Sequence, residues 1–222
     1  MSADRSERVK YPRTRHLPNS PGASADDVRL SDLSALAAGE VVLTEKMDGE
    51  NTTIGPGYVH ARSLDSPAHE SRTRVRALAG QIQAEIPAGM RVCGENLYAR
   101  HSIAYPRLPS YFLVFNIWQG DLCLDWDSTR EWAGLLGLQC VPELYRGPFR
   151  GPDELWRCWR AARDSATSEG FVVRTTAGFA RAQFGTHVAK WVRPSHVRTD
   201  EHWMAGPVIP NVLAGPEENG EG

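Results

Sequence analysis

Lysine is almost absent from this chain. Lys10, Lys46 and Lys190 are the three lysines among 25 lysine and arginine residues, so every other basic side chain is an arginine. The formal net charge of -2 argues against a uniformly basic nucleic-acid-binding coat, although arginines can still form a local basic stripe. Lys46 stands out because it lies in the stretch TEKMDGEN (44–51), between two carboxylates and a glycine turn.

Paired cysteines and long apolar runs are also lacking. The four cysteines are widely spaced, without a C-x-x-C pair, and no secretory segment opens the chain. We therefore expect reduced thiols in a cytoplasmic protein with no membrane partner, since no apolar run approaches the length of a membrane span. The seven histidines form no H-E-x-x-H pattern, which argues against a zinc site of that kind.

Composition and turn signals predict one main domain. Residues 1–28 are polar and rich in proline, serine and arginine, so we expect a flexible N-terminal arm. After this arm we expect a folded domain over 29–205 and a disordered tail over 206–222. Short β-prone runs separated by Asp48-Gly49 and Gly55-Pro56-Gly57 do not alternate regularly with helices. This pattern favours an α+β fold with mainly antiparallel sheets and flanking helices.

Three helices are predicted from apolar spacing and capping signals. Apolar residues recur at helical spacing over 69–86, before Pro87. Ser128 and Glu131 form a predicted capping box for the helix over 129–137. The stretch 153–165 is the third predicted helix.

Lys46 follows a predicted strand and precedes a tight turn, which suits a nucleophile that projects into a cleft. An amine attacks only when it is unprotonated, so the pKa of Lys46 must fall well below its usual value of about 10.4. We expect desolvation, together with Lys190 or a metal ion, to lower it. A surface lysine beside a hairpin turn would show the same K-x-D-G pattern, and that motif by itself is weak.

Five stretches in series are more specific than this one motif. They are EKMDGEN (45–51), GENLY (94–98), YFLVFNIW (111–118), EGFVVR (169–174) and VAKWVR (188–193). In order and approximate spacing they resemble the motifs of the covalent nucleotidyltransferases, which include ATP-dependent RNA and DNA ligases and mRNA capping guanylyltransferases. The resemblance covers about residues 41–193. Asn51 stands where phage nick-sealing RNA ligases have asparagine and DNA ligases usually have arginine, so the chain looks like an RNA ligase.

The resemblance implies a nucleotidyltransferase domain of the ligase type, with an ATP-grasp-like arrangement. It also implies that Lys46 attacks the α-phosphate of ATP, expels pyrophosphate and carries AMP. The AMP then passes to an RNA 5'-phosphate, which a 3'-hydroxyl attacks to seal the strand, as in RNA repair. Charge on the phosphate oxygens calls for cations and for Mg²⁺ or Mn²⁺ near the reacting atoms.

By the same resemblance, particular residues receive roles. Lys46, Lys190 and Glu169 are the implied catalytic residues, and Glu169 supports the metal ion. Glu95 holds the ribose, Phe115 stacks on adenine, and Glu45, Asn51 and Arg62 contact the nucleotide. Taken singly, Glu95 suits an exposed strand end, Phe115 a core strand, Arg62 a surface position and Lys190 a side chain lying along Trp191.

Other arginines are candidates for contacts with the RNA backbone. Arg72, Arg74 and Arg76 lie in one polar stretch with Ser71 and Thr73, which suits phosphate contact but also an ordinary solvated helix.

Departures from the family pattern leave alternatives open. Asn116 replaces an expected acidic residue, and Arg193 follows Val192, where the family more often has a second lysine. Because few residues follow Arg193, we expect a bare nucleotidyltransferase domain that engages RNA with help from a partner, such as an end-healing kinase or phosphatase. A minimal DNA ligase, a capping-type guanylyltransferase and a catalytically inactive RNA-binding module are the alternatives.

Overall fold

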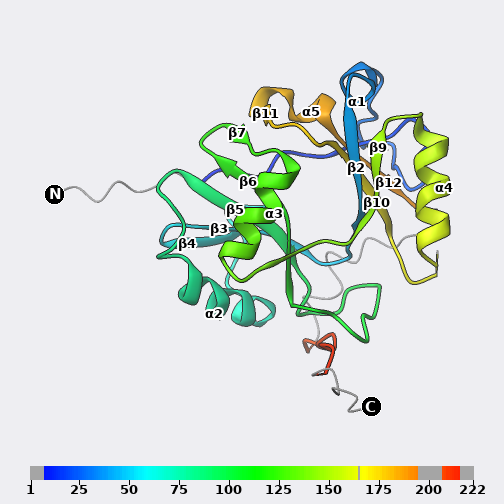
Figure 1. Cartoon of the computed structure of the whole chain (residues 1–222). Coiled ribbons are helices and arrows are strands. Elements are labelled where there is room, and N and C mark those ends of the chain that lie inside the picture. The colour runs from blue at the N-terminus through cyan, green and yellow to red at the C-terminus, as the bar shows by residue number, and fades with distance from the viewer. Residues whose placement is uncertain (1–7, 165, 195–206, 216–222) are drawn as a thin grey trace, which may run out of the picture.

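The computed structural model describes residues 8–164, 166–194 and 207–215 (Figure 1). Two sheets face each other across a central pocket. The first sheet has five strands in the order β1-β12-β10-β2-β9. These strands are β1 (Arg15–His16), β12 (Val188–Val192), β10 (Gly170–Thr175), β2 (Glu40–Lys46) and β9 (Glu143–Pro148). All of its pairings except β1 with β12 are antiparallel.

The second sheet has seven strands, in the order β11-β7-β6-β5-β3-β4, with β8 added beside β6. Its strands are β3 (Glu50–Gly55), β4 (Tyr58–Ala61), β5 (Met90–Asn96), β6 (Phe112–Gln119), β7 (Leu122–Cys123), β8 (Gln139–Cys140) and β11 (Phe179–Ala180). Only β6 and β8 pair in parallel. The predicted α+β fold with mainly antiparallel sheets and flanking helices is therefore confirmed.

Helices cover the outer faces of the two sheets and form separate cores with them (Figure 1). On the seven-stranded sheet, α2 (Thr73–Ile82) and α3 (Trp126–Leu135) pack on Val92, Val114 and Ile117. On the five-stranded sheet, α4 (Pro152–Ala162) packs Leu155 and Trp159 on Phe171. The remaining short elements are α1 (Ser34–Ala37), η1 (Glu70–Arg72), η2 (Arg181–Gln183) and α5 (Phe184–His187). The inner faces are thereby left to line the pocket.

Two helix predictions need correction at their boundaries. The helix expected over 69–86 is a 3-10 turn followed by α2, which ends at Ile82. The capping box at Ser128 and Glu131 is wrong, because α3 begins at Trp126 with Asp125 as its N-cap. The Asp125 carboxylate accepts from the backbone N–H of Ser128 at 2.8 Å, so an Asx-type cap starts the helix earlier than predicted.

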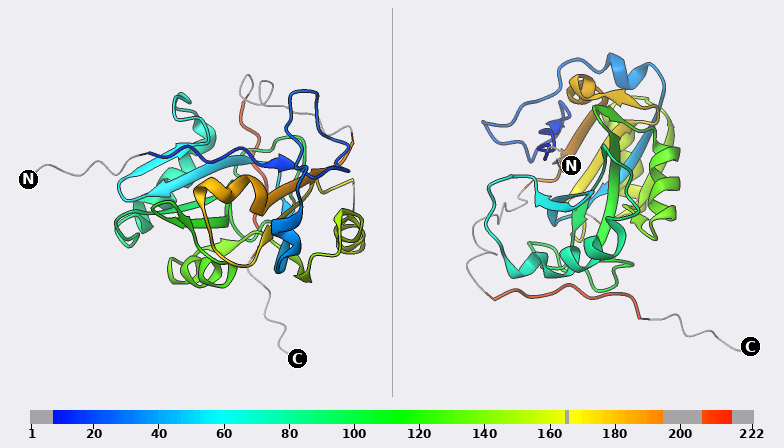
Figure 2. Two further views of the ribbon diagram at one scale, coloured as in Figure 1. Left: turned by 90° about the horizontal axis from the view of Figure 1, so that it is seen from above. Right: turned by 90° about the vertical axis from the view of Figure 1, so that its left-hand side faces the viewer.

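The terminal segments pack against the domain. The prediction of a flexible arm is wrong for residues 8–28. There β1 pairs with β12 (Figure 2), and Tyr11, His16 and Leu17 are buried. The predicted disordered tail is likewise wrong for residues 207–215, where Asn211 is buried and Pro210 bridges Ala99. Isolated apolar residues in polar stretches produce no periodic signal, so composition alone misplaced both segments. Residues 1–7 and 216–222 and the predicted boundary at 205 lie outside the described residues.

None of the helices in the described ranges is long and apolar enough to cross a membrane. Cys93, Cys123, Cys140 and Cys158 are all free thiols, as expected, and the first two are buried.

Candidate active site

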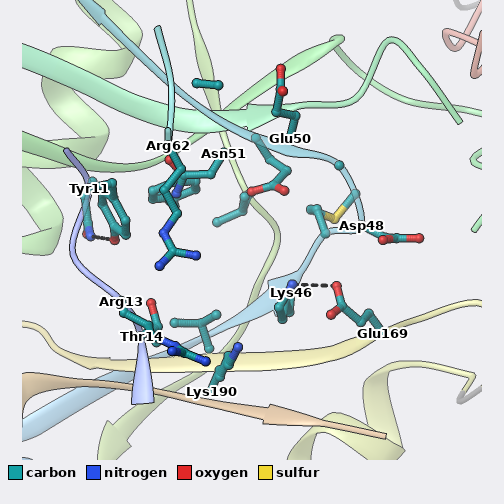
Figure 3. A pocket seen from close by; sticks show the side chains of 18 of the residues that line it. Tyr11, Arg13, Thr14, Lys46, Asp48, Glu50, Asn51, Arg62, Glu169 and Lys190 are labelled. Carbon is teal, nitrogen blue, oxygen red and sulfur yellow. Dashed lines mark hydrogen bonds and ion pairs between the residues drawn. The ribbon is translucent and has the colours of Figure 1, made fainter. Parts of the chain in front are cut away.

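A pocket of about 700 Å³ lies between the inner faces of the two sheets (Figure 3). The candidates Lys46, Glu169 and Lys190 line it from the five-stranded sheet or its ends. Asn51, Glu95 and Phe115 line it from the seven-stranded sheet, and Arg62 from the residue after β4. The structure therefore brings the predicted residues from distant stretches of sequence to one cavity.

Strand register explains why Lys46 and Lys190 reach the same cavity. Side chains alternate between the faces of a strand, and paired residues share a face. Lys46 and Thr44 therefore share one face of β2. Val172 pairs with Thr44 on one side and with Lys190 on the other, so both lysines lie on the pocket face.

The same register turns Glu45 away from the pocket interior. Glu45 pairs with Phe171, which belongs to the core under α4. Its carboxylate forms an ion pair with Arg163, just after α4, at 2.6 Å. Glu45 borders the cavity, but its side chain is engaged on the opposite face from Lys46.

Glu169 is placed beside Lys46 by the pairing of the next residue, Gly170, with Lys46 across β10 and β2. The Lys46 Nζ donates to Glu169 Oε2 at 2.5 Å. Gly170 has a φ of 152°, and a Cβ there would lie 2.1 Å from the Trp191 carbonyl oxygen. Only glycine permits this close approach of strands, so the Glu-Gly pair sets the position of the carboxylate.

Acidic groups surround the Lys46 ammonium. Burial by itself would lower its pKa, but the carboxylates of Glu169, Glu95 and Asp48 outweigh that effect and raise it. Among the protein's own side chains, the carboxylates therefore decide the direction of the pKa shift of Lys46. Burial, together with the negative charge of Glu169 and Asp48, raises the pKa of Glu95 to about 8 despite the attraction of Lys46.

Asp48 is fixed by the loop that joins β5 to β6. Its Oδ2 accepts from the Ser102 hydroxyl at 2.6 Å and from the backbone N–H groups of Ser102 and Ile103 at 2.9 and 2.8 Å. Its own N–H donates to the Tyr105 hydroxyl at 2.8 Å. These four bonds hold the turn that follows the nucleophile.

Basic side chains approach the cavity on the side away from Glu169. Figure 3 shows Arg62 descending from the seven-stranded sheet and Lys190 rising from β12 towards the same space. Arg13, in the N-terminal segment, also lines this side and pairs with Asp27 at 2.9 Å. The cavity thus has an acidic end around Lys46 and a basic side that suits phosphate oxygens.

The seven-stranded sheet presents polar and aromatic groups to the middle of the pocket. Asn51 and Glu95 are paired across β3 and β5. The buried Asn51 Oδ1 has no hydrogen-bond partner among the described residues, so it is available to a bound polar group. Among residues 112–118, Phe115 alone is only partly buried, which separates it from the core residues on its strand.

Residues 39–192 match the sequence model of the RNA ligase family. This chain belongs to the RNA ligase family. Its resemblance to the ATP-dependent RNA ligases is thereby confirmed. A search of curated protein sequences gives no match.

Solved structures with the same fold include RNA ligases and a DNA ligase. An archaeal ATP-dependent RNA ligase matches with a TM-score of 0.59 and 20% identity, over 82% of this chain and 48% of that one. A variant of the Naegleria gruberi RNA ligase with ATP and Mn matches with a TM-score of 0.52 and 13% identity, over 83% and 56%. A putative ATP-dependent DNA ligase from Aquifex aeolicus matches with a TM-score of 0.51 and 17% identity, over 82% and 49%.

At these identities the likeness shows the fold, which is that of ligase nucleotidyltransferase domains. This chain spans about half the length of those proteins.

The divalent metal ion that such a fold implies suits the acidic end of the pocket. Among the described residues no group of three His, Cys, Asp or Glu side chains could hold a metal ion by themselves. Mg²⁺, however, usually keeps several waters and uses one or two carboxylates together with substrate phosphates. Glu169 and Glu95 both raise the pKa of Lys46, so two carboxylates lie together at this end of the pocket and fit such an ion.

Three buried side chains beside Phe115 form contacts that the sequence did not predict. The Asn116 amide donates to the Tyr11 hydroxyl at 2.6 Å, and Arg174 donates to Asn116 Oδ1 at 2.5 Å. Tyr11 also packs edge-on against Phe115, with ring centroids 5.2 Å apart. Asn116 thus serves as a buried link between the N-terminal segment and β10. The one sign of this link in the sequence was the position of Asn116 next to Phe115, in a strand with a core-like pattern.

Arg72 is not an exposed phosphate contact. Its guanidinium forms a bidentate ion pair with Glu50, with Nε and Oε2 2.7 Å apart, and it is 4% exposed. The adjacent Ser71 carbonyl accepts from the amide of Asn96. Arg72 therefore ties η1 to Glu50 of the first motif, in place of the RNA contact predicted from the polar stretch, and Ser71 ties η1 to β5.

Proposed function

We propose that this chain is an ATP-dependent RNA ligase that works through a lysyl-AMP intermediate. The observation that carries the proposal is the convergence on one cavity of Lys46, the Glu169 carboxylate 2.5 Å from it, and Lys190 on the same sheet face. A catalytically inactive binding module would have no need to keep these three groups together.

In the first step the lone pair of Lys46 Nζ attacks the α-phosphorus of ATP. A P–N bond forms, the bond from the α-phosphorus to the bridging oxygen of the β-phosphate breaks, and pyrophosphate leaves with that electron pair. Lys190 and Arg62, on the basic side, offset charge on the phosphate oxygens. In the later steps AMP passes to an RNA 5'-phosphate, and a 3'-hydroxyl displaces the AMP.

Lys46 must lose a proton before it attacks, and Glu169 Oε2 is the adjacent atom that can accept it. The raised pKa of Lys46 opposes this transfer as long as three carboxylates stabilise the ammonium. Glu169 and Glu95 would hold a divalent cation, whose charge would offset these carboxylates and favour the free amine.

The nucleoside sits against the seven-stranded sheet in this proposal. Phe115 provides a flat face for the adenine ring, and Glu95 and Asn51 face the ribose. The fold is shared with a putative DNA ligase, so the fold alone does not separate the two activities. Asn51 is the residue that favours an RNA ligase over a minimal DNA ligase or a guanylyltransferase. The natural RNA would carry 5'-phosphate and 3'-hydroxyl ends, left by an end-healing kinase or phosphatase.

Incubation with α-labelled ATP or GTP and Mg²⁺ or Mn²⁺, followed by denaturing electrophoresis, tests the first step. We expect label from ATP that survives denaturation and is released by acid, as a phosphoramide should be. Label from GTP alone would move the chain to the guanylyltransferases. Absence of label from both nucleotides with both metals would contradict the enzyme assignment.

Nicked duplexes that differ only in the sugars beside the nick test the choice of strand. We expect sealing to require ribose at the 3'-hydroxyl end, because a 2'-hydroxyl and A-form geometry are what distinguish RNA from DNA at a protein site. Equal sealing of all-DNA nicks would assign the chain to DNA ligation. Adduct formation without joining on any substrate would support the need for a partner protein.

A further inference from the structure

The segment 207–215 returns to the domain and lies beside the loop 97–111, which joins β5 to β6. It is the red segment at the lower edge of the molecule in Figure 1 and in the right-hand view of Figure 2. Backbone hydrogen bonds join the two, among them Arg100 N–H to the Ile209 carbonyl and Val212 N–H to the Tyr105 carbonyl, at 2.8 and 3.0 Å. The loop is therefore paired along much of its length with a distant part of the chain.

Asn211 is the buried centre of this pairing, with an exposed fraction of 3%. Its Nδ2 donates to the Leu97 carbonyl at 2.8 Å, and its Oδ1 accepts from the Tyr105 N–H at 2.9 Å. The Tyr111 hydroxyl donates to the Asn211 carbonyl at 3.1 Å. The Asn211 side chain thus bonds the backbone of the loop at two points, Leu97 and Tyr105.

The part of the loop that Asn211 holds is the part that holds Asp48. Ser102 and Ile103 give three of the bonds to the Asp48 carboxylate, and the Tyr105 hydroxyl accepts from the Asp48 N–H. Tyr105 therefore carries both connections, with its backbone N–H on Asn211 and its hydroxyl on Asp48. Asp48 lies two residues after Lys46 and contributes to the raised pKa of that lysine.

We propose that Asn211 is a positioning residue for the adenylylation step. It fixes the loop 97–111, the loop fixes the Asp48 turn, and the turn fixes the direction and electrostatic surroundings of Lys46. The proposal rests on the proposed function, because it assigns Asn211 to the same reaction. It makes the segment 207–215 part of the catalytic domain.

Replacement of Asn211 separates positioning from general stability. Asn211→Ala leaves the Tyr105 N–H and the Leu97 carbonyl without their partner, so the loop should open more often. We expect amide hydrogen exchange at Asp48, Ser102 and Ile103 to become about tenfold faster or more, while the amides of α4 exchange at wild-type rates. Ile209→Ala is the matched control, since that side chain is 60% exposed and the loop bonds to the backbone carbonyl of Ile209.

Single-turnover kinetics provide the catalytic readout. In Asn211→Ala we expect the rate of adduct formation to fall by about 10- to 100-fold, because small misplacements of a reacting group cost this much. The dissociation constant for ATP should stay within about threefold, since no ATP contact is removed. Ile209→Ala should match the wild type in both.

A double-mutant cycle tests the route through Tyr105. Tyr105→Phe removes the hydroxyl that accepts from Asp48 but keeps the backbone N–H that donates to Asn211, so it also serves if Asn211→Ala fails to fold. We expect the double variant to react about as slowly as the slower single variant, because groups acting in one chain are not additive. Multiplicative losses in rate would overturn the proposed route.

The exchange measurement also separates the two hypotheses. If the wild-type chain forms no adduct, the proposed function fails, but faster exchange at Ser102 and Ile103 in Asn211→Ala still supports the coupling. Unchanged exchange at these residues in a folded Asn211→Ala variant would overturn the inference even if the wild type is active. An equal loss of ATP affinity and rate would reduce Asn211 to a purely structural residue.

Discussion

The two sheets bring different kinds of side chain to the pocket. The five-stranded sheet presents Lys46 and Lys190 on one face and Glu169 at the start of β10, all suited to bond making and to phosphate charge. The seven-stranded sheet presents Asn51 and Phe115, suited to hydrogen bonding and stacking. Changes on the first sheet should therefore alter the rate of the chemical step, and changes on the second should alter nucleotide affinity. Glu95 connects the two, since it stands on the second sheet and interacts electrostatically with Lys46.

The largest effect is expected at Lys46. Lys46→Ala and Lys46→Arg should both abolish the covalent adduct, because arginine keeps the charge but is not deprotonated and cannot attack phosphorus. Labelled ATP and denaturing electrophoresis measure the adduct, with Lys10→Ala as a control that should retain it. An adduct that persists in either Lys46 variant would move the nucleophile elsewhere.

Glu169 and Lys190 should show the next largest effect. Glu169→Ala and Lys190→Ala should each slow adduct formation by about 10²- to 10³-fold, as removal of one preorganised charged group commonly does. The affinity for ATP should change far less than the rate. The exposed Glu131→Ala on α3 is the control. A loss confined to ATP affinity would break the division between the two sheets.

The ionisation of Glu95 should make the free energy of unfolding depend on pH. Its pKa is about 8 in the folded protein and near 4.5 for an ordinary glutamate, so between these values the folded state holds a proton that the unfolded state has released. Stability should therefore decrease as pH rises through this range, by about 1 kcal/mol per pH unit from this group.

Urea unfolding at pH 5, 6, 7 and 8 measures this slope in the wild type and in the Glu95→Gln variant. The amide does not titrate, so the variant should lose less stability than the wild type as pH rises. An identical pH dependence in both proteins would show that Glu95 ionises normally.

Phe115 should show the smallest effect. Phe115→Leu keeps an apolar side chain but removes the flat face, and we expect the dissociation constant for ATP to rise by about fivefold, near 1 kcal/mol. The rate at saturating ATP should be nearly unchanged. Equilibrium dialysis or calorimetry measures the affinity, with the exposed Trp156→Leu as a control. A rate loss without an affinity loss would place Phe115 with the reacting groups.

Sequence alone predicted the residues of the central strands well, because their signals are local. The β-prone runs beside the two predicted turns lie on β2, β3 and β4, and the motif stretches 94–98, 111–118, 169–174 and 188–193 lie on or beside β5, β6, β10 and β12. The alternation of side chains along a strand could also have separated Glu45 from Lys46, since neighbouring residues on a strand face opposite ways. Motif matching gave both residues to the nucleotide, whereas the register with Phe171 places the two side chains on opposite faces.

The contacts that support the site could not be predicted, because they join residues far apart in sequence. Tyr11 reaches Asn116 from a polar stretch, and Asn211 reaches Tyr105 from a segment with the composition of a tail. The position of Arg72 against Glu50 also depends on where η1 packs. In each case one buried side chain makes the contact, which leaves no periodic pattern to detect.

The chemical identity of the nucleophile is the central claim, and adduct mapping tests it most directly. The wild-type chain, incubated with ATP and Mg²⁺ or Mn²⁺, is digested and its peptides are analysed by mass spectrometry under conditions that preserve phosphoramides. We predict one AMP on the peptide that contains Lys46, lost on acid treatment. AMP on Lys10 or Lys190, or no AMP on any peptide under either metal, would contradict the account.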